Sequence, residues 1–307
     1  MNIAAIIGLI GVAGVAATAA ALYTPDKPRA ELEARYAAPP SEFLPVDGLR
    51  VHVRDTGPRD GLAVIMLHGF GSSLHTWEPW ANALSDKYRV VRYDLPGFGL
   101  TGADPTGDYS DRRGMQVLAD LMDALSIRRA ALIGNSMGGK LAWMFAADHP
   151  SRVTKLILVS PDGFASPGFE YGKKADVPLL VRLLPYTLPT FMVRMNLAPA
   201  YGDPAALTDD LLTRYRDMML APGVRDAMIA RLAQVELQPP ESLLARITAP
   251  TLLVWGEKDA MIPVGNARDY TNVLQHSRVV TYPDLGHLPQ EEAPDRSLVP
   301  VRAYLDQ

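Results

Sequence analysis

The order of apolar runs along this chain constrains its fold more than any other feature. From residue 63 onward, apolar runs typical of β-strands alternate with segments that have the periodicity of amphipathic helices. The strand-like runs lie at residues 63–69, 88–97, 130–136, 153–160, 251–259 and 277–284. Strands that are apolar along most of their length are buried on both faces, and helices must then cover both faces. The alternation therefore predicts a parallel sheet between two layers of helices.

Two stretches depart from this alternation. Asp47-Gly48 separates two short strand-like runs, and because this dipeptide favours a tight turn, we expect a β-hairpin there. Residues 164–245 are apolar and helical in pattern, are interrupted by prolines, and contain no convincing strand-like run. We predict that they form a helical cap, inserted between two parts of one core at residues 43–163 and 246–307.

The N-terminal segment is of a different kind. Residues 3–22 carry no charge, and as a helix with a rise of about 1.5 Å per residue they would span about 30 Å, the thickness of a bilayer core. We predict a single transmembrane anchor at residues 1–24, then a polar linker at residues 25–42 that contributes little to stability. A cleaved secretory signal and a buried core helix are the alternatives. Lys27 and Arg29 follow the segment, which places the main domain in the cytoplasm.

Charge and cysteine content exclude several classes of function. The net charge is -4, with 30 basic and 34 acidic side chains, so the chain lacks the basic excess typical of proteins that bind nucleic acid. The sequence contains no cysteine, which excludes both a disulfide framework and a thiol nucleophile.

The segment GNSMGGKL, residues 134–141, matches two motifs with different chemistry. As G-x-x-x-x-G-K it is close to a phosphate-binding loop, but that loop needs Ser or Thr to hold Mg²⁺ where this chain has Leu141. As G-x-S-x-G it is a nucleophile elbow, a sharp turn between a strand and a helix with Ser136 at its tip. The elbow further requires an acid and then a histidine later in the chain.

Both partners of such a serine are available. His287 follows the last strand-like run on a loop that contains glycine, a position from which a base can reach a nucleophile on an earlier strand. Asp259 directly follows the preceding strand-like run and is the expected acid. Its rivals are three other acids near strand ends, Glu257, Asp162 and Asp284. The chain order Ser136, Asp259, His287 is that of an elbow-type serine hydrolase, so we predict these three as the catalytic residues.

Five motifs together resemble the α/β-hydrolase fold superfamily. They are HGFG, DLPGFGLT, GNSMGG, GEKDAMIP and LGHLPQEEAP, in the order and at the strand ends found in that superfamily. The resemblance extends over residues 43–305. It implies an α/β fold with a mostly parallel eight-stranded sheet, helices on both faces and an inserted helical cap, and it favours the elbow over the phosphate-binding loop.

The resemblance also implies the rest of the site. The backbone N–H groups of Phe70 and Met137 would form the oxyanion hole. Independently of the resemblance, the place of His68 directly before Gly69 suggests that it braces this loop. No metal, organic cofactor or nucleotide is expected to take part in this chemistry.

The expected activity is hydrolysis of a small hydrophobic carboxylic ester through an acyl-enzyme intermediate. An apolar, methionine-containing cap and a membrane anchor favour such a substrate, and the whole resembles monoacylglycerol-lipase-like and carboxylesterase members. The expected partners are this ester and the membrane, the latter through the N-terminal helix. Two alternatives are a C–C bond hydrolase of the meta-cleavage-product type, which GNSMGG also resembles, and a non-enzymatic binding scaffold.

Overall fold

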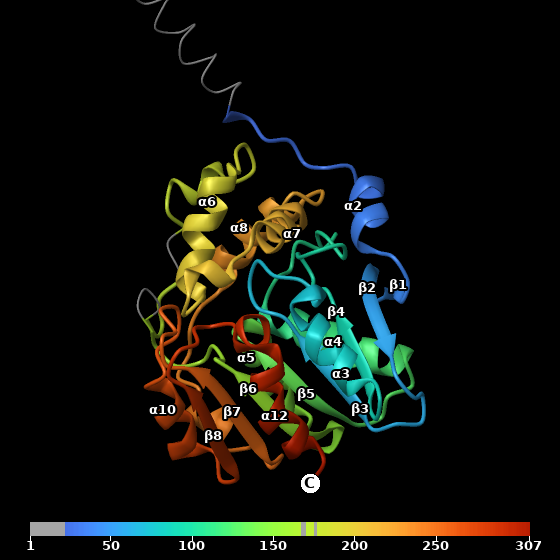
Figure 1. Ribbon diagram of the computed structural model, residues 1–307, viewed down its shortest axis with the longest axis vertical. Helices are drawn as coiled ribbons and strands as arrows, with labels where there is room; N and C mark the ends of the chain where they lie inside the picture. The colour runs from blue at the N-terminus through green and yellow to red at the C-terminus, as the bar shows by residue number, and fades with distance from the viewer. Residues whose placement is uncertain (1–21, 167–169, 175–176) are drawn as a thin grey trace, which may run out of the picture.

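The structure is a computed structural model that describes residues 22–166, 170–174 and 177–307. Its centre is an eight-stranded sheet with the strand order β1-β2-β4-β3-β5-β6-β7-β8 (Figure 1). The strands are β1 (Ser41–Val46), β2 (Leu49–Thr56), β3 (Ala63–Leu67), β4 (Arg89–Tyr93), β5 (Ala130–Asn135), β6 (Val153–Val159), β7 (Thr251–Gly256) and β8 (Ser277–Tyr282). Strand β2 pairs antiparallel with β1 and β4, and the other neighbouring strands are parallel. The predicted α/β fold with a mostly parallel eight-stranded sheet is confirmed.

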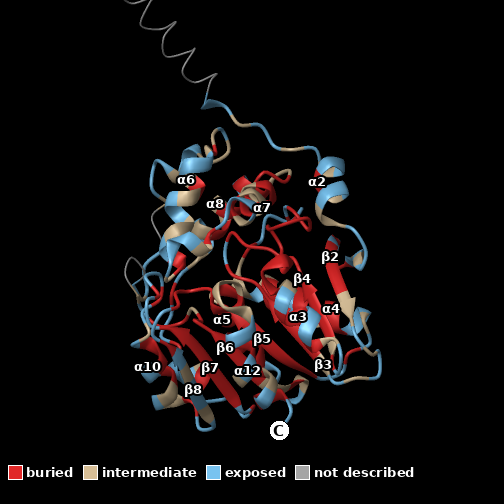
Figure 2. Ribbon diagram, in the orientation of Figure 1, coloured by how far each residue is buried: buried red, intermediate tan, exposed pale blue. Residues whose placement is uncertain are grey.

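Helices cover both faces of this sheet, as expected. The helices are α2 (Arg29–Tyr36), α3 (Glu78–Leu84), α4 (Asp111–Ala124), α5 (Met137–Asp148), α6 (Thr190–Leu197), α7 (Asp209–Met219), α8 (Val224–Gln234), α9 (Glu241–Leu244), α10 (Asn266–Val273), α11 (Pro289–Glu292) and α12 (Pro294–Leu305). Helices α4, α5 and α10 contribute to the apolar core on one face, and α3 and α12 contribute to the core on the other. Figure 2 shows the inner strands of the sheet as almost entirely buried, whereas the edge strands β1 and β8 are partly exposed.

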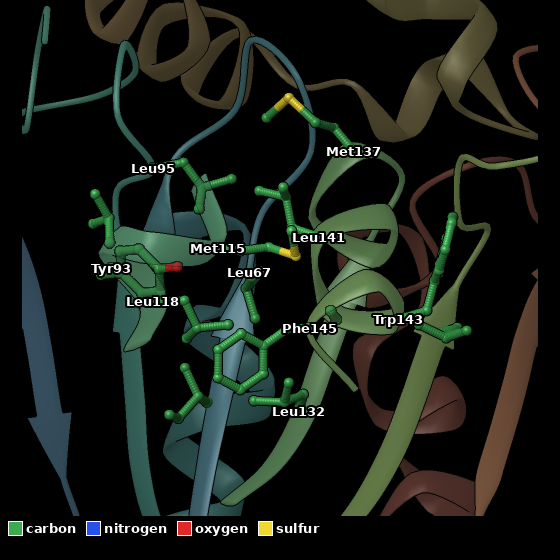
Figure 3. Packing of buried hydrophobic residues seen from close by; sticks show 14 of the residues in the cluster. Leu67, Tyr93, Leu95, Met115, Leu118, Leu132, Met137, Leu141, Trp143 and Phe145 are labelled. Atoms are coloured by element: carbon green, nitrogen blue, oxygen red, sulfur yellow. The ribbon is translucent and has the colours of Figure 1, made fainter. Parts of the chain in front are cut away.

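Alternate residues of a strand point to the two cores. In β3, Ile65 and Leu67 pack with α4 and α5, whereas Val64 and Met66 pack with α3 and α12. Figure 3 shows the first core, where Phe145 of α5 lies among leucines from the strands and from α4. Burial of both side-chain sets explains why inner strands such as β3 are apolar and why the sequence pattern identified them.

The chain between β6 and β7 forms a helical layer over one end of the sheet (Figure 1). Its described helices are α6 to α9, in the range predicted as the cap. The cap has an apolar cluster of its own, in which Tyr201 and Tyr215 pack together with Leu288 from the loop after β8. The cap and that loop therefore share one apolar core, so the position of one depends on the position of the other.

The segment before β1 is packed against the cap, although the sequence suggested a linker that contributes little to stability. Leu32 of α2 is buried in the main core. Asp217 of α7 is 2% exposed. Its carboxylate forms ion pairs with Lys27 Nζ at 3.1 Å and Arg35 Nη1 at 2.9 Å, and it accepts a hydrogen bond from Tyr36 Oη at 2.8 Å. Solvent screens the exposed ends of Lys27 and Arg35, but the buried carboxylate of Asp217 needs hydrogen-bond partners, and this segment supplies them. We therefore revise the expectation that residues 25–42 contribute little to stability.

The prediction of a single-pass membrane protein is contradicted and is withdrawn. Within the part of the chain that the structure describes, no helix is long and apolar enough to cross a membrane. The longest of these helices, α4, has 14 residues, which at about 1.5 Å per residue is about 21 Å, well short of the roughly 30 Å of a bilayer core. The predicted anchor itself, residues 1–24, lies outside the described residues up to residue 21.

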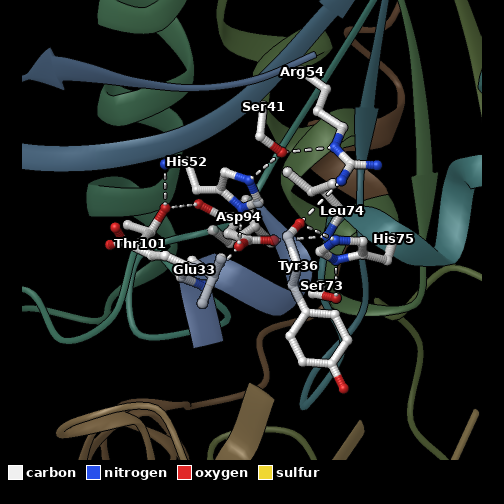
Figure 4. Close-up of polar contacts among 12 residues, drawn as sticks. Glu33, Tyr36, Ser41, His52, Arg54, Ser73, Leu74, His75, Asp94 and Thr101 are labelled. Atoms are coloured by element: carbon white, nitrogen blue, oxygen red, sulfur yellow. Dashed lines mark hydrogen bonds and ion pairs between the residues drawn. The ribbon is translucent and has the colours of Figure 1, made fainter. Parts of the chain in front are cut away.

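A buried carboxylate organises the loops at the end of the sheet nearest the cap. Asp94 follows β4 and is fully buried. Its carboxylate accepts hydrogen bonds from His52 Nδ1 at 2.8 Å, from the Leu74 amide at 2.7 Å and from the Leu100 amide at 2.7 Å. Burial alone would raise the pKa of Asp94, but the surrounding histidines hold it well below its usual range. Figure 4 shows Asp94 between His52 and Leu74, and this contact fixes the loop that begins with the HGFG motif.

Two buried histidines near Asp94 make stability depend on pH. Burial lowers the pKa of His75 to about 3, with Asp94 opposing this shift and Arg54 adding to it, and burial also lowers the pKa of His68. An unfolded chain protonates both rings near pH 6.5, whereas the folded chain protonates them only at lower pH, near 3 for His75. The unfolded state then binds more protons, so stability decreases as the pH falls below 6.5.

We predict that the free energy of unfolding decreases between pH 6.5 and pH 4.5, by up to about 1.4 kcal/mol per pH unit from His75, with His68 acting in the same direction. Denaturant titrations at several pH values measure this slope. In His75→Gln the side chain no longer titrates, so the slope should be smaller than in the wild type. Equal slopes in the two proteins would contradict the assignment.

Candidate active site

Ser136 lies at a sharp turn between β5 and α5. Its φ of 54° and ψ of -122° are a conformation that residues other than glycine rarely adopt, and such strain is concentrated at functional sites. The strand and the helix approach each other closely at this turn. A Cβ added to Gly134 would lie 2.4 Å from Gly138 O, and one added to Gly138 would lie 2.4 Å from Leu67 O. The chain thus has the strand–turn–helix geometry that the GNSMG motif predicts.

His287 and Asp259 meet on the loops that follow β8 and β7. His287 Nδ1 lies 2.7 Å from Asp259 Oδ2, and both residues are buried. The other oxygen, Asp259 Oδ1, accepts the amides of Met261 and Ile262, each at 2.8 Å. Because an ionised carboxylate can only accept, we assign the shared proton to Nδ1. Nε2 is then unprotonated and can accept a proton.

Ser136 and His287 line one cavity, and the two predicted oxyanion residues, Phe70 and Met137, line it with them. Its apolar lining also includes Leu232, Val235, Met261 and Ile262. Among the described residues, Ser136 Oγ makes no hydrogen bond to His287. In enzymes without bound substrate such bonds are often long and tighten only in the substrate complex. Four of the five predicted site residues therefore line one cavity, and the fifth, Asp259, is hydrogen-bonded to His287 beside it.

The predicted oxyanion donors are held by the loop after β3 and by the start of α5. Within the described chain, neither the Phe70 amide nor the Met137 amide donates a hydrogen bond to another residue. His68 fixes the first of these loops, because its Nδ1 lies 2.8 Å from Gly69 O and its Nε2 accepts the Leu95 amide at 2.9 Å. The bracing role expected of His68 is confirmed.

The rival acids do not contact the histidine. Glu257 and Asp284 are exposed, and each is hydrogen-bonded to a different side chain. Asp162 lines the cavity, and burial raises its pKa. However, the carboxylate that is hydrogen-bonded to His287 Nδ1 is that of Asp259.

Charged groups beside the cavity are paired with one another. Lys140, the lysine of the near-match to a phosphate-binding loop, lies 3.0 Å from Asp111 of α4. Arg231 of α8 lines the cavity and also pairs with Asp111. A lysine committed to a carboxylate is not available to hold a phosphate. Within the described ranges, no cluster of three or more His, Cys, Asp or Glu side chains could hold a metal ion.

Asn135 belongs to the site, although the sequence analysis did not identify it. Its Nδ2 donates to Val159 O and to His287 O, each at 3.1 Å, so it connects the strand end beside Ser136 to the histidine loop. The available signal was a polar amide at the end of an otherwise apolar strand, directly before the nucleophile. A buried polar group needs hydrogen-bond partners, and here they lie on two distant segments.

Comparison with known proteins gives a consistent fold and two kinds of activity. The model of the α/β hydrolase fold family matches residues 63–294. The chain is 30% identical to 2-hydroxy-6-oxo-6-phenylhexa-2,4-dienoate hydrolase of Burkholderia cepacia over 81% of this chain and 89% of that protein. A membrane phospholipase A, described as a bacterial virulence factor, is 28% identical, with a TM-score of 0.75 over 98% of this chain and 97% of its own. A meta-cleavage product hydrolase from Pseudomonas fluorescens IP01 is 24% identical and similar in fold, with a TM-score of 0.75 over 86% of this chain and 97% of its own.

We predict that Asp259→Asn lowers kcat for an activated aryl ester by about 10⁴-fold, because an amide neither holds the required imidazole tautomer nor stabilises the imidazolium. Steady-state kinetics measure this loss. Glu257→Gln is the matched control, since Glu257 is two positions away and exposed, and it should keep a kcat near that of the wild type. Similar values of kcat for the two variants would show that the acid is misassigned.

Proposed function

This chain belongs to the α/β hydrolase fold family, and from this premise we propose that it is a serine hydrolase acting on a hydrophobic carboxylic ester. The observation that carries the proposal is the 2.7 Å hydrogen bond between His287 and Asp259, a buried pair beside the cavity that Ser136 lines. A histidine oriented by a carboxylate is the arrangement that converts a serine hydroxyl into a nucleophile.

In the proposed reaction, Ser136 Oγ attacks the ester carbonyl carbon while His287 Nε2 takes the hydroxyl proton. Asp259 stabilises the imidazolium that forms. The carbonyl oxygen becomes an oxyanion and accepts the amide N–H groups of Phe70 and Met137. Loss of one such donor typically costs about 3–4 kcal/mol in the transition state.

The second half of the reaction uses the same groups. His287 gives its proton to the departing alcohol oxygen, and the C–O bond of the ester breaks to leave an acyl group on Ser136. A water molecule then attacks the acyl carbon while His287 takes its proton. The bond between the acyl carbon and Ser136 Oγ breaks, His287 returns the proton to Oγ, and the carboxylic acid leaves. The chain's own residues supply every proton transfer in this scheme.

The chemistry of the cavity supports a neutral substrate. Apart from the predicted site residues, its polar lining consists of Asp162, Ser166 and Arg231. The guanidinium of Arg231 is already paired with Asp111. A dienoate carries a carboxylate, and burying a carboxylate without an available cation costs several kcal/mol. A neutral ester avoids that cost and gains from contact with the apolar side chains.

The likeness to the membrane phospholipase A also supports an ester. A phospholipase A acts on lipid esters, and that match covers 98% of this chain, compared with 86% for the meta-cleavage product hydrolase. At 28% identity this likeness supports a class of substrate and not a particular lipid.

Hydrolysis of a C–C bond is the second candidate, and the curated relatives support it more directly than they support ester cleavage. Dienoate hydrolases of Burkholderia cepacia and Comamonas testosteroni are each 30% identical to this chain. The same serine, histidine and aspartate would serve that reaction. Arg231 would then have to release Asp111 in order to bind the carboxylate of the substrate.

A direct comparison of substrates separates the two candidates. We predict that kcat/KM for the best p-nitrophenyl ester, in a series from acetate to palmitate, exceeds that for 2-hydroxy-6-oxo-6-phenylhexa-2,4-dienoate by about a hundredfold or more, because the dienoate must bury an unpaired charge. Absorbance assays of purified protein measure both values. Faster cleavage of the dienoate would make C–C hydrolysis the function.

Ser136→Ala tests the step that the two candidates share. It should abolish both activities and labelling by a fluorophosphonate, while the circular dichroism spectrum stays that of the wild type. If the folded variant were labelled as fast as the wild type, Ser136 would not be the nucleophile.

A further inference from the structure

Glu292 is a half-buried carboxylate near His287 that the proposed reaction does not use. It is the last residue of α11. Its Oε1 accepts the amide of Gly286 at 2.7 Å, and its Oε2 accepts the amide of Gly202 at 2.7 Å. Gly286 directly precedes His287, whereas Gly202 belongs to the cap. One carboxylate therefore joins the histidine loop to the cap.

The two glycines bring the backbones of these segments into direct contact. A Cβ added to Gly202 would lie 2.3 Å from Asp284 O and 2.8 Å from Gly286 N. A Cβ added to Gly286 would lie 2.6 Å from both Ala200 O and Gly202 N. No real side chain tolerates such distances, so the approach depends on glycine on both sides.

His287 is part of the same junction through its own backbone. Its N–H donates to Ala200 O of the cap at 2.7 Å. Its carbonyl oxygen accepts Asn135 Nδ2 from the end of β5 at 3.1 Å. The backbone of His287 thus spans the distance between the cap and the strand that carries Ser136, while its side chain reaches Asp259.

The neighbouring residue, Glu291, holds the cap from the same short helix. Its side chain is 4% exposed. It accepts hydrogen bonds from three side chains of the cap, namely Tyr201 Oη at 2.6 Å, Arg214 Nη2 at 2.5 Å and Tyr215 Oη at 3.2 Å. The two consecutive carboxylates therefore bind different partners. Glu291 binds side chains of the cap, and Glu292 connects the cap backbone to the loop of His287.

We propose that Glu292 is a positioning residue for His287, and that its bond to Gly202 makes the position of His287 follow that of the cap. This inference rests on the proposed role of His287 as the base. None of Glu292, Gly202 and Gly286 lines the cavity with Ser136, so their effect on the reaction must pass through the histidine.

The energetics of Glu292 agree with a positioning role. Burial raises the pKa of its carboxyl, and the amides of Gly286 and Gly202 oppose this shift. A carboxylate kept in such a place needs those N–H groups, and it binds them more strongly than a neutral acceptor would. A displacement of about 1 Å in a catalytic group can lower a rate by about 10²-fold, so a contact this close to His287 affects the rate.

Glu292→Gln tests the proposal with a change of one atom. An amide offers one oxygen, so it can accept only one of the two N–H groups, and its NH₂ faces the other donor. We predict that the maximal rate of labelling by a fluorophosphonate, kinact, falls by about tenfold to a hundredfold. The concentration giving half-maximal rate, KI, should change little, because the cavity lining is intact. This probe reacts at the serine whichever bond the natural substrate offers.

Gly202→Ala tests the same junction from the cap. Its added methyl would push against Asp284 O, so it should produce the same loss in kinact with little change in KI. In both variants the downfield proton resonance of the Nδ1–H shared by His287 and Asp259 should shift or broaden. Glu257→Gln is the matched control and should leave kinact, KI and the resonance as in the wild type.

The outcomes distinguish failure of the serine hydrolase proposal from failure of the proposed role of Glu292. If the wild type is not labelled at all, the serine hydrolase proposal fails. If the wild type is labelled, and folded Glu292→Gln and Gly202→Ala keep its kinact and its resonance while only their unfolding temperatures fall, Glu292 is structural and the inference is overturned. Should Glu292→Gln not fold, Gly202→Ala alone decides between the same two results.

Discussion

The close approach of α5 to β5 and β3 is the constraint on which the rest of the site depends. Glycine at 134 and 138 allows backbone to pack on backbone, and Ser136 between them is forced to a φ of 54°. The same approach brings the start of α5 against the end of β3, since an atom added at Gly138 would meet the carbonyl oxygen of Leu67. The loop that begins at His68 therefore starts beside the nucleophile.

The strand order of the sheet places the other site residues near Ser136. Strands β5, β6, β7 and β8 are parallel neighbours, so the loops at their carboxyl ends gather at one edge, where α/β folds place their sites. Hydrogen bonds to backbone amides then hold these loops in register. Asp94 binds the loop after HGFG, Asn135 binds the carbonyl of His287, and Glu292 binds the amide before it. The cap joins this system through Gly202.

The sequence predicts the parts of this arrangement that have a local signal. Uninterrupted apolar strands led to the sheet. The order of Ser136, Asp259 and His287 led to a serine and a histidine that line one cavity and to the acid bonded to that histidine. Asn135, Asp217 and Glu292 carry no comparable signal, because their partners are groups distant in the chain. The same limit explains why residues 25–42 were expected to contribute little to stability, since the buried acid that binds them lies in the cap. An uncharged run suggested an anchor, and among the described residues no helix supports it.

The central claim is that Ser136 forms a covalent acyl intermediate with the help of His287 and Asp259. Rapid acid quenching during turnover of a p-nitrophenyl ester, followed by mass spectrometry of the protein and its peptides, tests this most directly. The account predicts an added mass equal to the acyl group, located on the peptide that contains Ser136. Turnover at a measurable rate with no acyl mass on the protein, or with the acyl group on another residue, would contradict it.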